Sequence, residues 1–250
     1  MIPYANPWMF NQPKDHTKLR LFCFPYAGGG ATAYLQWQKD ILPEIDICPI
    51  ELPGRGKRFI EQPFTSLAPL IEALAEGIEP YLTMPFAFFG HSMGGLISFE
   101  LARYLRKQQM ALPMHLFISA FRAPQLPPVS PPLHQLSDAE FIQELKRFNG
   151  TPPAVLEHAE LMQLLLDVLR ADFSLCETYR YTIEEPLSCS ISVFGGLQDQ
   201  EVTRAELEQW RQQTTRPASL RMFPGDHFFL VAMQKLLLQM ISQDLAAYLQ

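Results

Sequence analysis

The sequence contains few cysteines, and their spacing is typical of neither a metal site nor a disulfide framework. The four cysteines are Cys23, Cys48, Cys176 and Cys189. They include no Cys-x-x-Cys pair, and three of the four lie in apolar or strand-like stretches. Reduced thiols behave as small apolar residues and are usual inside intracellular proteins. We therefore expect reduced core thiols, with no structural disulfide, no metal and no redox cofactor.

Long apolar runs and an excess of positive charge are also absent. No uninterrupted apolar stretch reaches the about 18 residues that suggest a membrane-spanning helix, and no basic segment followed by an apolar one opens the sequence. The formal charge of -6 and the pI near 5.5 provide no basic surface for nucleic acid. We expect a soluble cytoplasmic protein that binds neither membranes nor nucleic acids.

The sequence does contain enough apolar material for a substantial core. Its 250 residues are 48% hydrophobic and 18% charged, which fits a single domain over residues 1–250. Strand-like segments are expected at residues 19–25, 45–52, 86–89, 116–121, 189–194 and 219–223. Helical patterns are expected at residues 32–39, at 66–82 with Thr65 or Ser66 as the cap, and after residue 229. This alternation predicts an α/β fold with a mostly parallel sheet and helices on both faces.

One long segment interrupts the alternation of strands and helices. Approximately residues 122–188 separate two expected strands; the segment opens with Pro124, Pro127, Pro128, Pro131 and Pro132 and continues with a helical pattern over 161–173. A loop of this length without secondary structure is uncommon. We expect a helical insertion that packs over the strand ends as a lid. The alternative is an ordinary continuation of the helical layer beside the sheet.

The most informative motif is Gly90-His91-Ser92-Met93-Gly94, which follows an apolar strand and precedes an amphipathic helix. Small residues two positions before and after a serine allow the sharp turn called a nucleophile elbow, which exposes the serine hydroxyl. Ser92 is therefore the candidate nucleophile. The alternative is a tight turn with an idle serine.

A serine nucleophile needs a base and an orienting carboxylate. Among the six histidines, His227 follows the last expected strand in a short loop; the others are His16, His91, His115, His134 and His158. Asp199 ends the segment after the preceding strand, and Asp226 is its competitor as a neighbour of His227. The order Ser92, Asp199, His227 is typical of the α/β-hydrolase fold.

Two backbone amides complete the expected site. The N–H of Met93, next to the nucleophile, and that of Ala27, in the loop after the first strand, are the candidate oxyanion donors. The neighbouring glycines 28–30 lack both the P-loop lysine and the dinucleotide-binding spacing, so we expect no bound nucleotide. The basic segment 54–58 is expected to be a solvated surface loop, with docking of an acidic partner as the alternative.

Taken together, the motifs resemble those of type II thioesterases that accompany nonribosomal peptide and polyketide synthases. The resemblance covers roughly residues 18–249. It is carried by Pro25-Tyr-Ala-Gly-Gly, Pro53-Gly-Arg-Gly-Lys-Arg, Gly90-His-Ser-Met-Gly-Gly, Leu169-Arg-Ala-Asp-Phe, Gly195-Gly-Leu-Gln-Asp and Gly225-Asp-His-Phe-Phe. It implies a stand-alone, monomeric hydrolase that removes stalled or wrong acyl groups from the phosphopantetheine arm of acyl or peptidyl carrier proteins. Ser92, Asp199 and His227 match the family triad, and the substrate itself carries the phosphopantetheine.

The sequence departs from the family pattern at two places. Tyr26 stands where the family often has histidine, and Asn149-Gly150-Thr151-Pro152 replaces a usual Gly-Gly-Thr-Pro. Both departures leave the acyl specificity open. Medium-chain fatty-acyl carrier thioesterases share the motifs, a general carboxylesterase fits the triad alone, and a non-catalytic interaction module is the alternative from another class.

Overall fold

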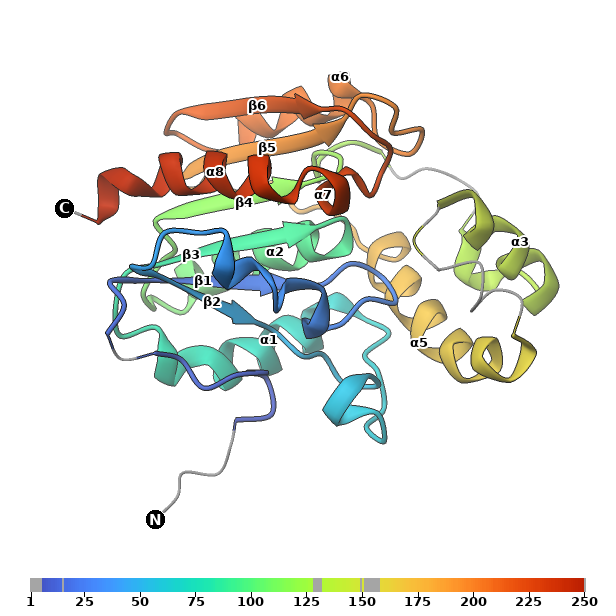
Figure 1. The fold of residues 1–250 in the computed structure, drawn as a ribbon. Coiled ribbons are helices and arrows are strands. Elements are labelled where there is room, and N and C mark those ends of the chain that lie inside the picture. Colours follow the sequence, from blue (N-terminus) through green and yellow to red (C-terminus); the bar gives the residue numbers. More distant parts are fainter. Residues whose placement is uncertain (1–5, 15, 128–131, 149, 151–157, 250) are drawn as a thin grey trace, which may run out of the picture.

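A six-stranded parallel sheet forms the centre of the molecule in the computed structural model, with strand order β2-β1-β3-β4-β5-β6 (Figure 1). The structure describes residues 6–14, 16–127, 132–148, 150 and 158–249. The strands are β1 (Leu19–Phe24), β2 (Ile45–Pro49), β3 (Phe86–His91), β4 (His115–Ser119), β5 (Ser190–Gly196) and β6 (Ala218–Phe223). The predicted parallel α/β architecture is confirmed.

Helices connect the strands and cover both faces of the sheet. The α-helices are α1 (Leu67–Ile78), α2 (Met93–Lys107), α3 (Asp138–Phe148), α5 (Ala159–Glu177), α6 (Arg204–Glu208), α7 (Phe229–Ala232) and α8 (Gln234–Leu245). Short 3₁₀ turns are η1 (Ala31–Tyr34), η2 (Trp37–Lys39), η3 (Gly56–Arg58), η4 (Glu79–Tyr81), η5 (Leu133–Gln135), η6 (Gln209–Gln213) and η7 (Ala246–Tyr248). Ser66 precedes α1 as expected, although its side chain makes no capping hydrogen bond.

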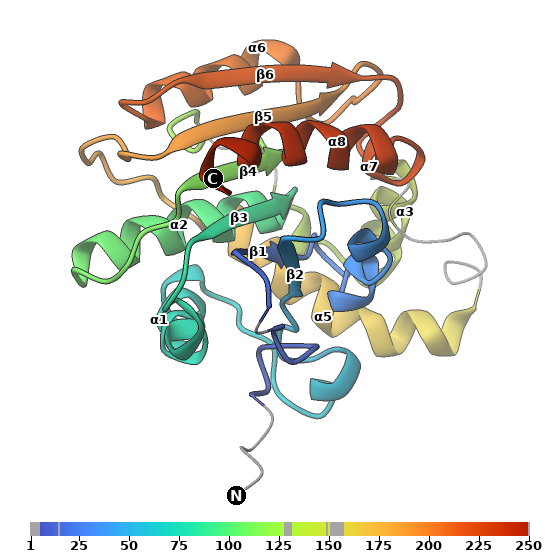
Figure 2. The same cartoon turned by 60° about the vertical axis from the view of Figure 1, so that its left-hand side comes forward.

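The alternation of side chains along the strands divides the core into two layers. Phe22 and Phe88 face the layer that contains α1 and α2, whereas Leu21 and Phe89 face the layer that contains η1, η2 and α8. Figures 1 and 2 show α8 on the opposite side of the sheet from α1 and α2. Because both faces are covered, the strand ends are the part of the sheet left for function.

The expected helix at residues 32–39 is wrong, since η1 and η2 occupy this segment instead. Tyr34 and Trp37 are both buried and both contact the ring of Phe89, with centroid distances of 5.8 and 4.7 Å. Tyr34 ends η1 and Trp37 begins η2, so the packing of both rings on the sheet replaces the regular α-helix that the pattern predicted.

The segment before β1 is part of the core. Trp8 and Met9 are buried, and Met9 forms an antiparallel bridge with Ile50. The indole of Trp8 lies so close to Gly77 on α1 that a Cβ there would meet it at 2.1 Å, while the Arg58 guanidinium lies 4.2 Å from the ring centroid. Trp8 and Met9 therefore contribute to the layer around α1.

The surface assignment of the basic segment 54–58 is also wrong for its two arginines. Arg55 and Arg58 are buried, at 8% and 7% exposure. Arg58 forms a bidentate pair with Glu61 at 2.9 and 2.6 Å and donates to the Glu51 carbonyl at 3.2 Å. Lys57 is exposed. Buried arginines require partners: Arg58 pairs with Glu61, three residues away, whereas Arg55 pairs with Asp172 on α5.

Helices α3 and α5 of the insertion pack together beyond the arrowheads of the strands (Figure 1). They share a small core of Phe141, Leu145, Met162, Leu166 and Leu169. This position agrees with the expected placement over the strand ends. Pro128, Pro131, Asn149, Thr151 and Pro152 lie outside the described residues.

Candidate active site

The turn between β3 and α2 places Ser92 at the carboxyl end of the central strand. Its φ and ψ are 51° and -122°, and its N–H donates to the Ser119 carbonyl on β4 at 2.7 Å. A Cβ at Gly90 would lie 1.9 Å from the Gly94 oxygen, and one at Gly94 would lie 2.2 Å from the Phe24 carbonyl oxygen. Glycine at both positions thus permits the strained turn, as the elbow motif requires.

The structure brings Ser92, His227 and Asp199 into one hydrogen-bonded row. His227 Nε2 lies 3.1 Å from Ser92 Oγ, and His227 Nδ1 lies 2.9 Å from Asp199 Oδ2. The Asp199 and His227 side chains are 1% and 8% exposed. A proton on Nδ1 lets the ring donate to Asp199 and leaves Nε2 to accept from the serine hydroxyl.

The backbone fixes the candidate acid from its other side. Asp199 Oδ1 accepts from the N–H groups of Glu201 and Val202, at 2.8 and 3.2 Å. The carboxylate therefore keeps one oxygen on the turn after β5 and the other on the imidazole. Asp226, the competitor, accepts from the N–H of Phe228 at 2.9 Å instead.

A second histidine, His91, lies directly behind the candidate base. Its ring is fully buried, its Nδ1 lies 2.9 Å from Ser119 Oγ, and its centroid lies 5.3 Å from that of His227. Burial, and then the neighbouring His227, hold the pKa of His91 well below its ordinary value. His91 therefore stays neutral and adds no positive charge beside the base.

The remaining histidines lie away from the serine or have other partners. His115, at the start of β4, lies 2.9 Å from Ser192 Oγ, and His134 pairs with Glu177 in the insertion. His16 and His158 are exposed. Of the histidines predicted as possible bases, the structure brings His227 to Ser92.

The two candidate oxyanion donors belong to Met93 and Ala27, which line the same pocket as Ser92. Met93 is the first residue of α2, a position whose N–H has no acceptor within its own helix. Ala27 lies in the loop after β1, between Tyr26 and Gly28. Both residues line the same pocket as the serine, so the arrangement suits an anion that develops there.

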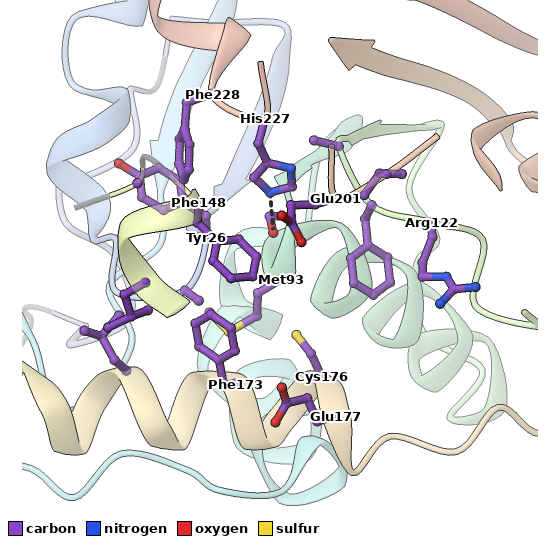
Figure 3. A pocket seen from close by; sticks show the side chains of 18 residues that line it. Tyr26, Met93, Arg122, Phe148, Phe173, Cys176, Glu177, Glu201, His227 and Phe228 are labelled. Atoms are coloured by element: carbon purple, nitrogen blue, oxygen red, sulfur yellow. Dashed lines mark hydrogen bonds between the residues drawn. The ribbon is translucent and has the colours of Figure 1, made fainter. Parts of the chain in front are cut away.

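The pocket beside Ser92 has a volume of about 200 Å³. Tyr26 and Phe228 come from the loops after β1 and β6, whereas Leu145, Phe148 and Phe173 come from the insertion. Figure 3 shows Phe173 pointing from α5 toward Met93. This apolar chamber can hold an acyl chain next to the nucleophile.

The sequence analysis connected Tyr26 with the acyl specificity, and Tyr26 does line the pocket, but it assigned no role to the other wall residues. Phe173 and Phe228 belong to the motifs that carried the resemblance, and that was the available signal. Phe148 lies in no quoted motif. The pocket also includes Glu177 and Glu201, but these carboxylates already pair with His134 and Arg147.

Neither a metal site nor a membrane span is visible in the described parts of the chain. No group of three or more histidine, cysteine, aspartate or glutamate side chains among those residues could hold a metal ion. No helix among them is both long and apolar enough to cross a membrane.

Comparison with known proteins identifies the family of this chain. The sequence model of the family described as thioesterase domain matches residues 19–245. The chain belongs to the thioesterase family. This thioesterase is 51% identical over 230 residues to the gramicidin S biosynthesis protein GrsT of Aneurinibacillus migulanus, covering 92% of this chain and 90% of that protein. It is thus a serine hydrolase.

Solved thioesterase structures have the same fold along nearly the whole chain. The RedJ thioesterase from the prodiginine pathway of Streptomyces coelicolor has a TM-score of 0.87 and 38% identity, covering 93% of each chain. YbtT, a type II thioesterase from the yersiniabactin NRPS/PKS pathway, has a TM-score of 0.84 and 29% identity, covering 97% of this thioesterase and 98% of YbtT. The α/β-hydrolase fold is therefore shown for this thioesterase.

Proposed function

We propose that this protein is a type II thioesterase that hydrolyses acyl thioesters on the phosphopantetheine arm of carrier proteins in a nonribosomal peptide or polyketide synthase. The observation that carries the proposal is the row Ser92, His227, Asp199 beside an apolar chamber. The family match and the relatives named for such pathways support the choice of substrate.

The first half of the proposed reaction transfers the acyl group to the enzyme. Ser92 Oγ attacks the thioester carbonyl while His227 Nε2 accepts the hydroxyl proton. Asp199 holds the imidazole in the required tautomer and stabilises its protonated form. The amides of Ala27 and Met93 stabilise the oxyanion, and His227 returns the proton to the departing phosphopantetheine thiol.

The second half releases the acyl group as an acid. Water loses a proton to His227 as it attacks the acyl-serine, and the protonated imidazole then restores the Ser92 hydroxyl. The aromatic walls of the chamber, including Phe148 and Phe173, hold the chain away from bulk solvent. These steps need no metal and no redox cofactor.

The working form that we propose is a cytoplasmic monomer that meets an acyl or peptidyl carrier protein. The insertion, 122–188, serves as the lid that admits the phosphopantetheine arm, while the carrier protein stays outside. Neither nucleic acid nor membrane takes part in this proposal.

Carrier proteins loaded with a panel of acyl groups test the substrate, with release followed by intact-protein mass spectrometry. The wild-type protein should release acyl groups from the carriers. Ser92→Ala should lose both turnover and labelling by a fluorophosphonate, while keeping the melting temperature of the wild type. The matched control, Ser98→Ala, removes a buried hydroxyl that bonds within α2, so labelling should persist.

Three outcomes would overturn parts of the proposal. Hydrolysis of a simple ester without carrier release would indicate a general carboxylesterase. Release of medium-chain fatty acyl groups alone would favour a fatty-acyl carrier thioesterase. Labelling of Ser92→Ala at the wild-type rate would show that another residue is the nucleophile.

A further inference from the structure

A buried ion pair lies beside the candidate oxyanion loop, and the reaction proposed above does not use it. Arg55 Nη1 and Nη2 each lie 2.7 Å from one carboxylate oxygen of Asp172, and the side chains are 9% and 1% exposed. Arg55 follows β2, whereas Asp172 lies on α5 of the insertion. The pair therefore joins the sheet edge to the insertion.

Both members of the pair also bind the backbone of the loop after β1. Asp172 Oδ2 accepts from the N–H of Gly28 at 2.8 Å, and Arg55 Nη1 donates to the carbonyl of Gly29 at 3.0 Å. These are charge-assisted hydrogen bonds in a buried setting, so they hold the loop more firmly than neutral bonds would. Ala27 directly precedes the two glycines.

The held peptide groups determine where the Ala27 N–H points. The carbonyl of Tyr26 shares a planar peptide with that N–H and accepts from Gly29 N–H at 2.9 Å. The next peptide, between Ala27 and Gly28, is held by Asp172, and the Gly29 carbonyl is held by Arg55. Because the C=O and N–H of a trans peptide point in opposite directions, holding the Tyr26 oxygen orients the Ala27 N–H.

We propose that Arg55 and Asp172 are positioning residues for the Ala27 oxyanion donor. The inference rests on the proposed function, because it takes the Ala27 amide as part of the oxyanion hole. Neither side chain touches the reacting atoms; the pair acts through the backbone of the loop.

A purely structural role is the competing explanation, since Leu169 and Asp172 both contact Gly28 from α5. Apolar side chains of similar volume often hold two elements together as well as a buried ion pair does. Apolar side chains, however, cannot accept a hydrogen bond from the Gly28 N–H or donate one to the Gly29 carbonyl. Replacement of both charges by apolar groups therefore separates anchoring of the helix from orientation of the loop.

The test is the double variant Arg55→Met/Asp172→Leu, assayed with 4-nitrophenyl acetate. Its kcat should fall by about 10²-fold with little change in KM, because a misplaced oxyanion donor weakens the transition state rather than substrate binding. The melting temperature should stay close to that of the wild type. The matched control is Arg221→Met/Asp244→Leu, which removes another bidentate pair, at 2.6 and 2.7 Å, and should keep kcat.

A second variant covers the case in which the double variant does not fold. Arg55→Lys keeps the charge opposite Asp172 but has no planar fork to reach Asp172 and the Gly29 carbonyl together. Its kcat should fall by about tenfold at unchanged KM.

Wild-type kcat in the double variant, or an equal loss in both double variants, would overturn the positioning role. For Arg55→Lys, an unchanged kcat or a change confined to KM would overturn it. The ester assay also separates the two proposals. If the wild type cleaves the ester but not carrier thioesters, the carrier assignment fails while the positioning role is still measured.

Discussion

The two candidate oxyanion donors are held in place in different ways. Met93 lies in an elbow that is held by backbone atoms. Gly90 packs against the Gly94 oxygen, and Gly94 packs against the Phe24 carbonyl oxygen at the end of β1. Ala27 lies in a loop that is held by Asp172, 144 residues away from Gly28, and by Arg55. The elbow is thus held by backbone atoms of its own turn and of the adjacent strands, whereas the loop is held by side chains from the insertion and from the segment after the edge strand.

The largest expected effect is a loss of kcat on removal of the Asp199 charge, which acts on the reaction that both oxyanion donors assist. Asp199→Asn should leave the fold intact and lower kcat by up to ~10⁴-fold, because the imidazole then loses its required tautomer. The control is Asp226→Asn, and kinetics on a carrier thioester is the measurement. An equal loss in the control would transfer the acid role to Asp226.

Gly94→Ala tests the elbow that holds the Met93 donor, and it should act mainly on the stability of the fold. The added Cβ meets the Phe24 carbonyl at 2.2 Å, and this oxygen belongs to a central strand that cannot move alone. We expect a loss of about 4 kcal/mol or more in the free energy of unfolding, measured by denaturant titration. Wild-type stability would show that the elbow can relax.

His115, at the start of β4, lies at the opposite end of the sheet from Ser92 and serves as a reference for the stability of the fold. Burial lowers the pKa of His115 to about 4, and Asp244 only partly offsets this effect. The unfolded chain therefore binds more protons between pH 6.5 and 4, so stability is full above this window and falls as the pH drops through it. The loss should approach roughly 3 kcal/mol by pH 4.

His115→Gln keeps a group that can bond Ser192 but does not titrate. Urea titrations at pH 7 and pH 4 should show a smaller acid-induced loss for this variant than for the wild type. The same loss in both proteins would assign the acid sensitivity to other groups.

The matching change beside the Ala27 donor, Gly28→Ala, should lower the stability less. Alanine at φ +74° costs about 1–2 kcal/mol, and the collision, at 2.5 Å, is with the far end of the Leu169 side chain, which can rotate away. We expect a stability loss well below that of Gly94→Ala and a clear drop in kcat at similar KM. Comparable stability losses would remove the contrast between the two donors.

The smallest expected effect concerns the outer face of α5. Leu164 is 56% exposed, so Leu164→Glu should change stability by no more than about 0.5 kcal/mol. If α5 guides a carrier-bound substrate, release from carriers should fall severalfold while hydrolysis of 4-nitrophenyl acetate persists. Leu236→Glu, on α8, is the control. Equal effects on both substrates would argue against a lid role.

The contrast between the donors also explains what the sequence could predict. The sequence motif of the elbow lies within five positions, Gly90 to Gly94, and the order Ser92, Asp199, His227 follows from strand ends that a parallel sheet brings to one edge. The sequence pattern alone predicted both the elbow and the order of the three residues. The hydrogen bonds of His227 with Ser92 and Asp199 join residues that this pattern had already selected.

Features that depend on distant partners were missed. Arg55 and Arg58 form part of a local basic run, and nothing in that run indicated that Asp172 would pair with Arg55 or that the Trp8 ring would cover Arg58. The 3₁₀ turns at 31–39 likewise depend on Phe89, which lies on another strand. Tertiary packing overrides local pattern at both places.

The contact between Trp8 and Gly77 extends the core of the molecule ahead of the segment that matches the family model. The match to the family model begins at residue 19, yet the indole fills a space on α1 that only a glycine leaves open. A polypeptide trimmed to residues 18–250 would keep Ser92, Asp199 and His227 but expose that face of α1. We expect such trimming to cost about 3–5 kcal/mol, as for removal of a buried tryptophan; domain boundaries for expression belong ahead of Trp8.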